Sequence, residues 1–133
     1  MPPLKCLDTD LLVGILRGKS DAKEKIEQFA SEGKQATTAI NAFELFYGAY
    51  ISLRAQENLK AARILLSRLH VLPLGITSAE SAGKLVAHLE KKGTMLDLKD
   101  AMIAALASDN GLTLVTRNRK DFSRVPGLLV EEW

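Results

Sequence analysis

The sequence has a single cysteine, Cys6, among its 133 residues. One cysteine excludes an internal disulfide framework and a cysteine-based zinc cluster, and it fits the reducing cytoplasm, where we expect the protein to reside. Long apolar runs are also missing, since nothing approaches the roughly eighteen residues of a membrane span. The longest early run, residues 11–16, is broken by Gly14 and preceded by Asp8 and Asp10, which argues against a signal peptide. We therefore expect no membrane segment.

An excess of one charge is lacking as well. Eighteen Lys and Arg residues face sixteen Asp and Glu residues, a formal net charge of +2. Taken alone, this sum argues against a strongly basic nucleic-acid binder. The hydrophobic fraction of 47% is that of a globular protein, and the length is usual for one domain. We expect a single domain that spans residues 1–133.

Short apolar runs alternate with longer segments of helical periodicity. The predicted strands are residues 4–7, 36–40, 70–74, 112–115 and 128–130. The predicted helices are residues 10–17, 20–33, 41–52, 56–69, 78–91 and 98–110, the third of them capped by Asn41. Strands that alternate with helices indicate an α/β fold with a mostly parallel sheet.

Acidic residues follow the predicted strands, at the edge where open parallel sheets bind their ligands. Asp8 ends the first strand, Glu44 lies four residues after the second, and Asp121 follows the strand at 112–115. Asp100 lies in the first turn of a predicted helix that is nearly all small and apolar. Three of these acids have a simpler interpretation: helix capping for Glu44, the helix dipole for Asp100 and a turn for Asp121. Asp8 fits this simpler interpretation least, because a charge between two buried segments needs a partner or a metal.

Four converging carboxylates repel one another unless cations or raised pKa values offset the repulsion. Oxygen ligands without a histidine or cysteine pattern select Mg²⁺ or Mn²⁺. Such ions can deprotonate a water and stabilise charge on a phosphodiester. The acids therefore support a hypothesis of metal-dependent phosphodiester hydrolysis.

These residues resemble a known family. Four segments are similar to motifs of the PIN-domain ribonucleases, specifically VapC-type toxins of toxin–antitoxin modules. They are Leu7-Asp8-Thr9, residues 41–49 (NAFELFYGA), residues 100–105 (DAMIAA) and residues 111–118 with Asp121-Phe122. The resemblance covers essentially the whole chain. It implies a three-layer α/β/α sandwich around a mostly parallel sheet of four or five strands. It also implies an Mg²⁺- or Mn²⁺-dependent endoribonuclease, a homodimer and a VapB-type antitoxin, with tRNA or ribosomal RNA as possible substrates.

Carried over to this chain, the resemblance assigns catalytic, metal-binding roles to four acids: Asp8, Glu44, Asp100 and, as the more variable fourth, Asp121. It assigns supporting roles to Thr116 and Asn118, and we expect Thr9 to support the site as well. Asp97 is either a further metal ligand or a supporting group. Two departures stand out. Asp10 occupies a position where many relatives have Asn or Ser, and Asp97 is a second acid three residues before Asp100.

Two further groups of residues each have two interpretations. The first group is the basic run beside Asp121, which consists of Arg117, Arg119, Lys120 and Arg124. These residues either belong to a solvated loop or contact RNA phosphates. If they bind RNA, the net charge of +2 averages an acidic pocket and a basic rim. The second group is either core packing or an interface for a dimer or antitoxin: Phe43, Phe46, Tyr47 and Tyr50.

Two other functions compete with this hypothesis. Asp8-Thr9-Asp10 suggests a haloacid-dehalogenase-type phosphatase, but that motif needs Thr or Ser where Leu12 stands. A PIN-like RNA-binding or RNA-processing module without a toxin role is the second alternative. The complete set of acids argues against loss of turnover, and metal titration would distinguish the two.

Overall fold

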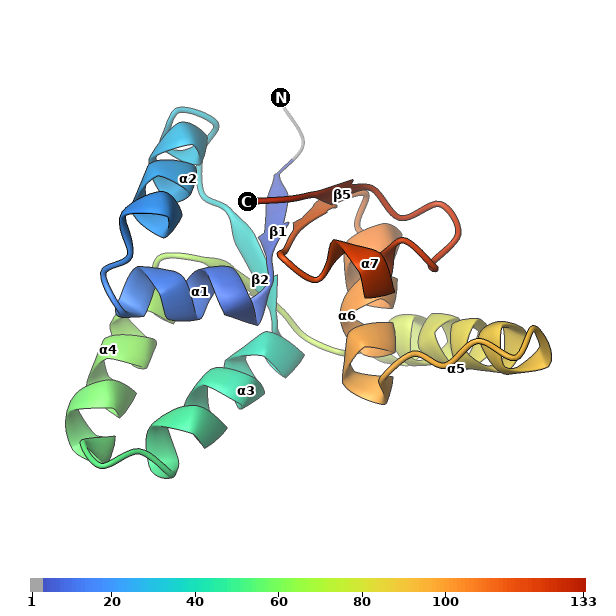
Figure 1. Cartoon of the computed structure of the whole chain (residues 1–133), viewed down its shortest axis with the longest axis horizontal. Helices are drawn as coiled ribbons and strands as arrows, with labels where there is room; N and C mark the ends of the chain where they lie inside the picture. The colour runs from blue at the N-terminus through green and yellow to red at the C-terminus, as the bar shows by residue number, and fades with distance from the viewer. Residues whose placement is uncertain (1–3) are drawn as a thin grey trace.

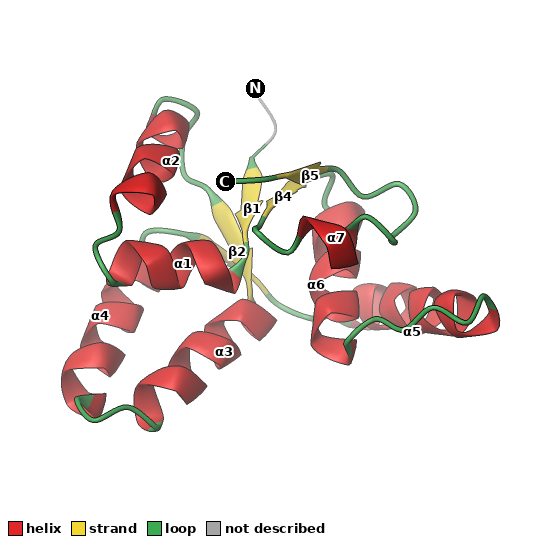
Figure 2. Ribbon diagram, viewed as in Figure 1, coloured by secondary structure: helices red, strands yellow, loops and turns green. Residues whose placement is uncertain are grey.

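The structure, a computed structural model, describes residues 4–133. Within them, five strands form one sheet in the order β3-β2-β1-β4-β5, and every neighbouring pair is parallel (Figures 1 and 2). The strands are β1 (Lys5–Leu7), β2 (Ala36–Thr38), β3 (His70–Leu72), β4 (Thr113–Val115) and β5 (Val130–Glu131). The predicted parallel sheet is therefore confirmed.

Helices cover both faces of this sheet, as Figure 1 shows. On one face lie α1 (Thr9–Leu16), α2 (Ser20–Ala30), α3 (Ala39–Tyr50) and α4 (Ala55–Ser67). On the other lie α5 (Ile76–Lys91), α6 (Leu98–Asp109) and the short α7 (Arg119–Phe122). The predicted three-layer α/β/α sandwich is confirmed.

Two hydrophobic cores separate these layers, because successive side chains of a strand point to opposite faces. In β1, Leu7 joins the core beneath α1–α4, whereas Cys6 joins the core beneath α6. In β4, Val115 joins the core beneath α1–α4 and Leu114 joins the core beneath α6. All four are fully buried, and each large apolar side chain contributes about 1.5–3 kcal/mol by its burial. Burial raises the pKa of the Cys6 thiol to about 12, so this thiol stays neutral in the core.

The start of α3 differs from the prediction. Thr38, not Asn41, caps the helix: the Thr38 hydroxyl accepts from the Asn41 backbone N–H at 3.1 Å. The Asn41 amide oxygen in turn accepts from the Thr38 backbone N–H at 3.3 Å, which completes a capping box. The last hydroxyl of β2 supplies the cap, so the helix begins at Ala39 and Glu44 has no capping role. A second difference is α7, in a segment predicted as a loop.

The aromatic side chains of α3 divide between two environments. Phe46 packs against the core, as one of the two interpretations predicted. Phe43, Tyr47 and Tyr50 are 57%, 59% and 65% exposed, so the core interpretation is wrong for them. Their role in an interface stays a prediction. Among the described residues, no helix is both long enough and apolar enough to cross a membrane.

Candidate active site

The candidate site lies between the carboxyl ends of β1 and β4. The chain runs outward from β1 to β2 and β3, then returns to place β4 on the other side of β1. Ligands of open parallel sheets bind where the strand order reverses in this way. Asp8 follows β1 and Thr116 follows β4, so both side chains meet at this point.

Asp8 is the most enclosed acid of the site, with 7% of its surface exposed. Its Oδ1 accepts from the Thr9 backbone N–H at 2.9 Å and from Asn41 Nδ2 at 3.0 Å. Its Oδ2 accepts from the Thr116 hydroxyl at 2.7 Å. These three donors hold the carboxylate in one orientation.

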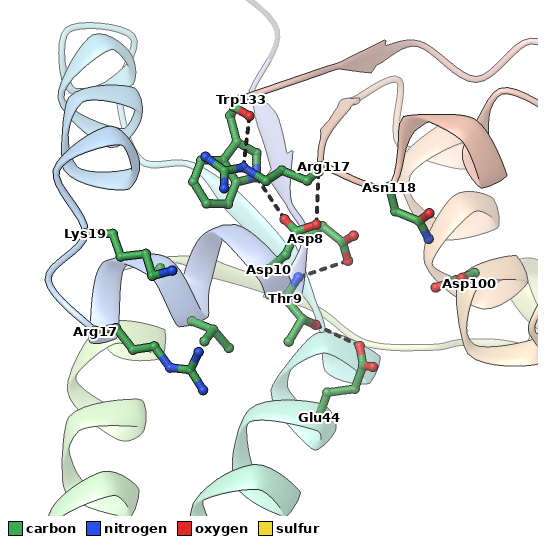
Figure 3. Close-up of a pocket in the computed structure, with 12 residues that line it drawn as sticks. Asp8, Thr9, Asp10, Arg17, Lys19, Glu44, Asp100, Arg117, Asn118 and Trp133 are labelled. Carbon is green, nitrogen blue, oxygen red and sulfur yellow. Dashed lines mark hydrogen bonds between the residues drawn. The ribbon is translucent and has the colours of Figure 1, made fainter.

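Glu44 is attached to the same network through Thr9. The Thr9 hydroxyl donates to Glu44 Oε1 at 2.7 Å (Figure 3). The same hydroxyl accepts from Asn41 Nδ2 at 2.9 Å. The fully buried Asn41 amide links the cap of α3 to Asp8 directly and to Glu44 through Thr9. Lys99 lies 3.7 Å from Glu44 Oε2 and partly balances its charge.

Asp100, in the first turn of α6, approaches from the opposite wall of the pocket (Figure 3). Burial raises its pKa to about 6, and the charges of Asp8, Asp97, Glu44 and Asp121 add to the rise. Asp97 itself caps α6 and accepts from the Lys99 N–H at 2.9 Å. Asp8, Glu44 and Asp100 therefore line one pocket, whereas Asp121 lies outside its lining and only adds to the negative charge near Asp100.

The pKa of Asp8 is likewise raised, to about 6. Burial is the main cause, and the charges of Asp10 and Glu44 contribute, whereas the bonds from Thr116 and Thr9 act in the opposite direction. Two carboxyl groups with raised pKa values that face one pocket form an unfavourable anionic site. A divalent cation would relieve this repulsion.

The residues fit a hard divalent cation that keeps most of its water. Among residues 4–133, no three acidic, histidine or cysteine side chains lie close enough together to ligate one ion. Mg²⁺ is commonly held by one or two carboxylates, with waters and substrate phosphates as its other ligands. Asp8 and Asp100 fit this pattern best, since they carry the raised pKa values and line the same pocket.

Asp10 connects the pocket to the end of the chain (Figure 3). Its Oδ2 accepts from the Arg117 N–H at 2.9 Å and from the Thr116 hydroxyl at 3.2 Å. Its Oδ1 accepts from Trp133 Nε1 at 2.8 Å. The Trp133 ring lies close to Gly14, where an added Cβ would stand only 3.0 Å from the ring. Asp10 therefore fastens the C-terminal segment beside Asp8.

Arg117 completes this arrangement. Its guanidinium lies 3.7 Å from the centre of the Trp133 ring, donates to the Trp133 carbonyl and pairs with Asp21. The ion pair lowers the pKa of Asp21. Asn118 also lines the pocket, and its N–H donates to the Thr116 hydroxyl at 2.9 Å. The supporting roles of Thr116 and Asn118 stay a prediction.

The rest of the predicted basic run lies outside the lining of this pocket. Arg119 lies 4.0 Å from Glu132, and Arg124 pairs with Asp121 at 3.8 Å and donates to the Met95 carbonyl. Lys120 is exposed on α7. Their contacts with RNA stay a prediction.

Sequence reasoning missed part of the site. Asn41 was predicted as a helix cap and not as the donor to Asp8, and Trp133 was assigned no role. The pocket of about 480 Å³ is also lined by Arg17 and Lys19, which flank Gly18. The sequence Arg17-Gly18-Lys19 places two cations around a glycine that can end a helix, but only the fold shows that they line the same pocket as the acids.

Comparison with known proteins decides the family. The PIN domain family matches residues 5–128. The chain belongs to the PIN-domain family. The tRNA(fMet)-specific endonuclease VapC of Salmonella typhimurium is 34% identical over 128 residues, which are 96% of each protein. Ribonuclease VapC2 of Rickettsia felis is 33% identical over the same length and coverage. The predicted resemblance to VapC-type ribonucleases is confirmed.

Solved structures agree with this assignment of the PIN-domain chain. VapBC2 from Rickettsia felis, bound to a DNA fragment from its promoter, aligns with a TM-score of 0.90 and 31% identity over 98% of both chains. The DNA-bound VapBC of Salmonella typhimurium aligns with a TM-score of 0.88 and 35% identity, also over 98% of both chains. Both likenesses extend over nearly the full PIN fold.

Proposed function

We propose that this PIN-domain protein is a VapC-type endoribonuclease toxin that hydrolyses RNA phosphodiester bonds and is neutralised by a VapB-type antitoxin. The observation that carries the proposal is the pair of acids at the reversal of strand order, Asp8 and Asp100, whose pKa values are both raised to about 6. The named activities of its relatives and the VapBC complexes of its structural neighbours support the same function.

In this proposal, Asp8 and Asp100 would hold Mg²⁺ or Mn²⁺, and Glu44 and Asp121 would add negative charge near the ion. When bound, the cation supplies a Lewis acid that activates water and stabilises charge on the phosphodiester. The chain itself fixes the ligands: Thr116 and Asn41 orient Asp8, and Thr9 orients Glu44. Asp97 supports Asp100 indirectly, as the cap of α6.

The remaining parts of the proposal concern partners and place of action. Residues 1–133 act as one domain in the cytoplasm, where cleavage of tRNA or ribosomal RNA would inhibit translation. The exposed side chains of Phe43, Tyr47 and Tyr50 suit contact with a second copy or with the antitoxin. RNA phosphates would be held by the basic residues near the site: Arg117, Arg119, Lys120 and Arg124.

The test is cleavage of RNA by the purified protein with Mn²⁺, with and without EDTA. We expect wild type to cleave, and Asp8→Asn or EDTA to abolish cleavage. Asp109→Asn is the matched control, because Asp109 bonds Ser78 and Ser81 between α5 and α6 and does not line the acidic pocket. Cleavage that persists in Asp8→Asn contradicts the assignment, and RNA binding without any cleavage favours a non-catalytic module.

A further inference from the structure

The acidic pocket has a basic side that the proposed chemistry leaves without a role. Figure 3 shows Arg17 and Lys19 on the α1–α2 side of the pocket, opposite Asp100, with the Asp8 region between them. Arg17 ends α1 and Lys19 precedes α2, so both come from one tight connection. Gly18 between them has a φ of 70°, a left-handed conformation that glycine adopts without strain. The backbone therefore fixes the turn that carries both residues, whose side chains are exposed.

Neither cation is neutralised by a neighbour. Within residues 4–133, Arg17 and Lys19 form no ion pair, although Glu44 lines the same pocket. By contrast, Arg117 on the same pocket is paired with Asp21, and Lys99 lies beside Glu44. Arg17 and Lys19 are thus the pocket-lining cations that remain free to meet an anion.

The pocket also has lining residues without charge. Val13 and Gly14 line it, with the Trp133 ring beside them. One part of that ring lies against Gly14, and Arg117 covers its face at 3.7 Å, so the ring has little freedom to stack on a base. This side of the pocket therefore suits the recognition of a charged backbone more than of a base.

We propose that Arg17 and Lys19 form a phosphate subsite that binds the RNA strand next to the scissile phosphodiester. This inference rests on the proposed nuclease function and adds the direction of the strand's path, from the acids around Asp100 toward the α1–α2 connection. Because the contacts are to phosphate, they strengthen binding to all sequences alike. The subsite binds substrate and transition state equally, so it lowers KM and leaves kcat unchanged.

The test compares two double variants of equal charge. Arg17→Ala/Lys19→Ala removes the subsite, and Arg63→Ala/Lys34→Ala removes two exposed cations that form no ion pair in the described chain and do not line this pocket. Binding of a fluorescein-labelled single-stranded RNA is followed by anisotropy in EDTA, which prevents cleavage, across a series of salt concentrations. Each phosphate contact on a single strand contributes about 0.7 to the slope of log K against log salt, or about fivefold in affinity at 0.1 M salt.

We expect the pocket variant to lose about 1.4 from this slope and about 25-fold in affinity at 0.1 M salt, and the control variant to lose far less. Arg17→Lys should retain most of the slope, since charge is what the subsite supplies. In cleavage assays with Mn²⁺, KM should rise with kcat unchanged. Equal slopes for the two double variants would overturn the subsite. Failure of wild type to cleave RNA would instead count against the nuclease function, and the slopes would still decide the binding question.

Discussion

Replacing Asp8 by asparagine should stabilise the metal-free protein at neutral pH while it removes metal binding. Asparagine keeps the shape of the side chain and most of its hydrogen bonds. Its Oδ1 can accept from the Thr9 N–H and Asn41 Nδ2, as the carboxylate does. Its Nδ2 can donate to the Thr116 hydroxyl, which already lies 3.2 Å from Asp10 Oδ2 and can turn its proton there. The variant therefore loses the charge without leaving a buried donor unpaired.

The magnitude follows from the pKa of Asp8, about 6 in the folded protein against an ordinary value of 3.8. Because the folded state binds this proton more tightly than the unfolded chain does, the group stabilises the fold fully below about pH 3.8. That contribution to the free energy of unfolding is lost as the pH rises to about 6. A shift of about two units corresponds to about 3 kcal/mol. Asp8→Asn has no ionisable group at this position, so its free energy of unfolding does not include this loss.

The assay is urea denaturation of both proteins in EDTA, at pH values on each side of this window. The advantage of Asp8→Asn over wild type should grow by about 3 kcal/mol between pH 3.8 and pH 7. Excess Mn²⁺ should stabilise wild type but not the variant, and so reduce or reverse the difference. The same pH dependence in both proteins would refute the claim that Asp8 is an unfavourable buried charge.

The remaining predictions concern the C-terminal contacts and helix packing. Trp133→Phe keeps an aromatic ring but loses the 2.8 Å bond to Asp10 and part of the indole's contact area. It should lower the free energy of unfolding by about 1.5–3 kcal/mol in urea denaturation, and an unchanged value would mean that this bond contributes nothing. Gly14→Ala places a Cβ 2.9 Å from Ala22 Cβ and should lower the free energy of unfolding by about 1–3 kcal/mol. The added Cβ of Gly48→Ala meets no atom within 4 Å, so this variant should raise the free energy of unfolding by about 0.5–1 kcal/mol. Both changes would be measured as shifts in melting temperature. Equal shifts for the two glycines would contradict the packing described for α1 and α2.

The sequence was most informative where apolar runs end in an acid. Asp8 and Asp100 adjoin segments that must be buried, so their convergence could be inferred from the rule that ligands bind at the carboxyl ends of parallel strands. The sheet and its two helical layers followed from the alternation of strand and helix patterns. These features depend on local pattern and on topology, which the order of residues largely determines.

The contacts that orient the site were harder to foresee. Thr38 and Asn41 are both plausible helix caps, and the choice of Thr38 frees the Asn41 amide to reach Asp8 across 33 positions of sequence. The bond from Trp133 to Asp10 spans 123 positions. Such pairs leave no periodic signal, because each depends on how the finished layers meet.

The central claim is that Asp8 and Asp100 jointly hold a divalent cation. Calorimetric titration of Mn²⁺ into wild type, Asp100→Asn and the control Asp109→Asn tests it most directly. At pH 6, near the pKa of both acids, wild type and Asp109→Asn should bind Mn²⁺ and release protons, and Asp100→Asn should bind at least about tenfold more weakly. Equal affinity in all three proteins, or binding without proton release, would contradict the account.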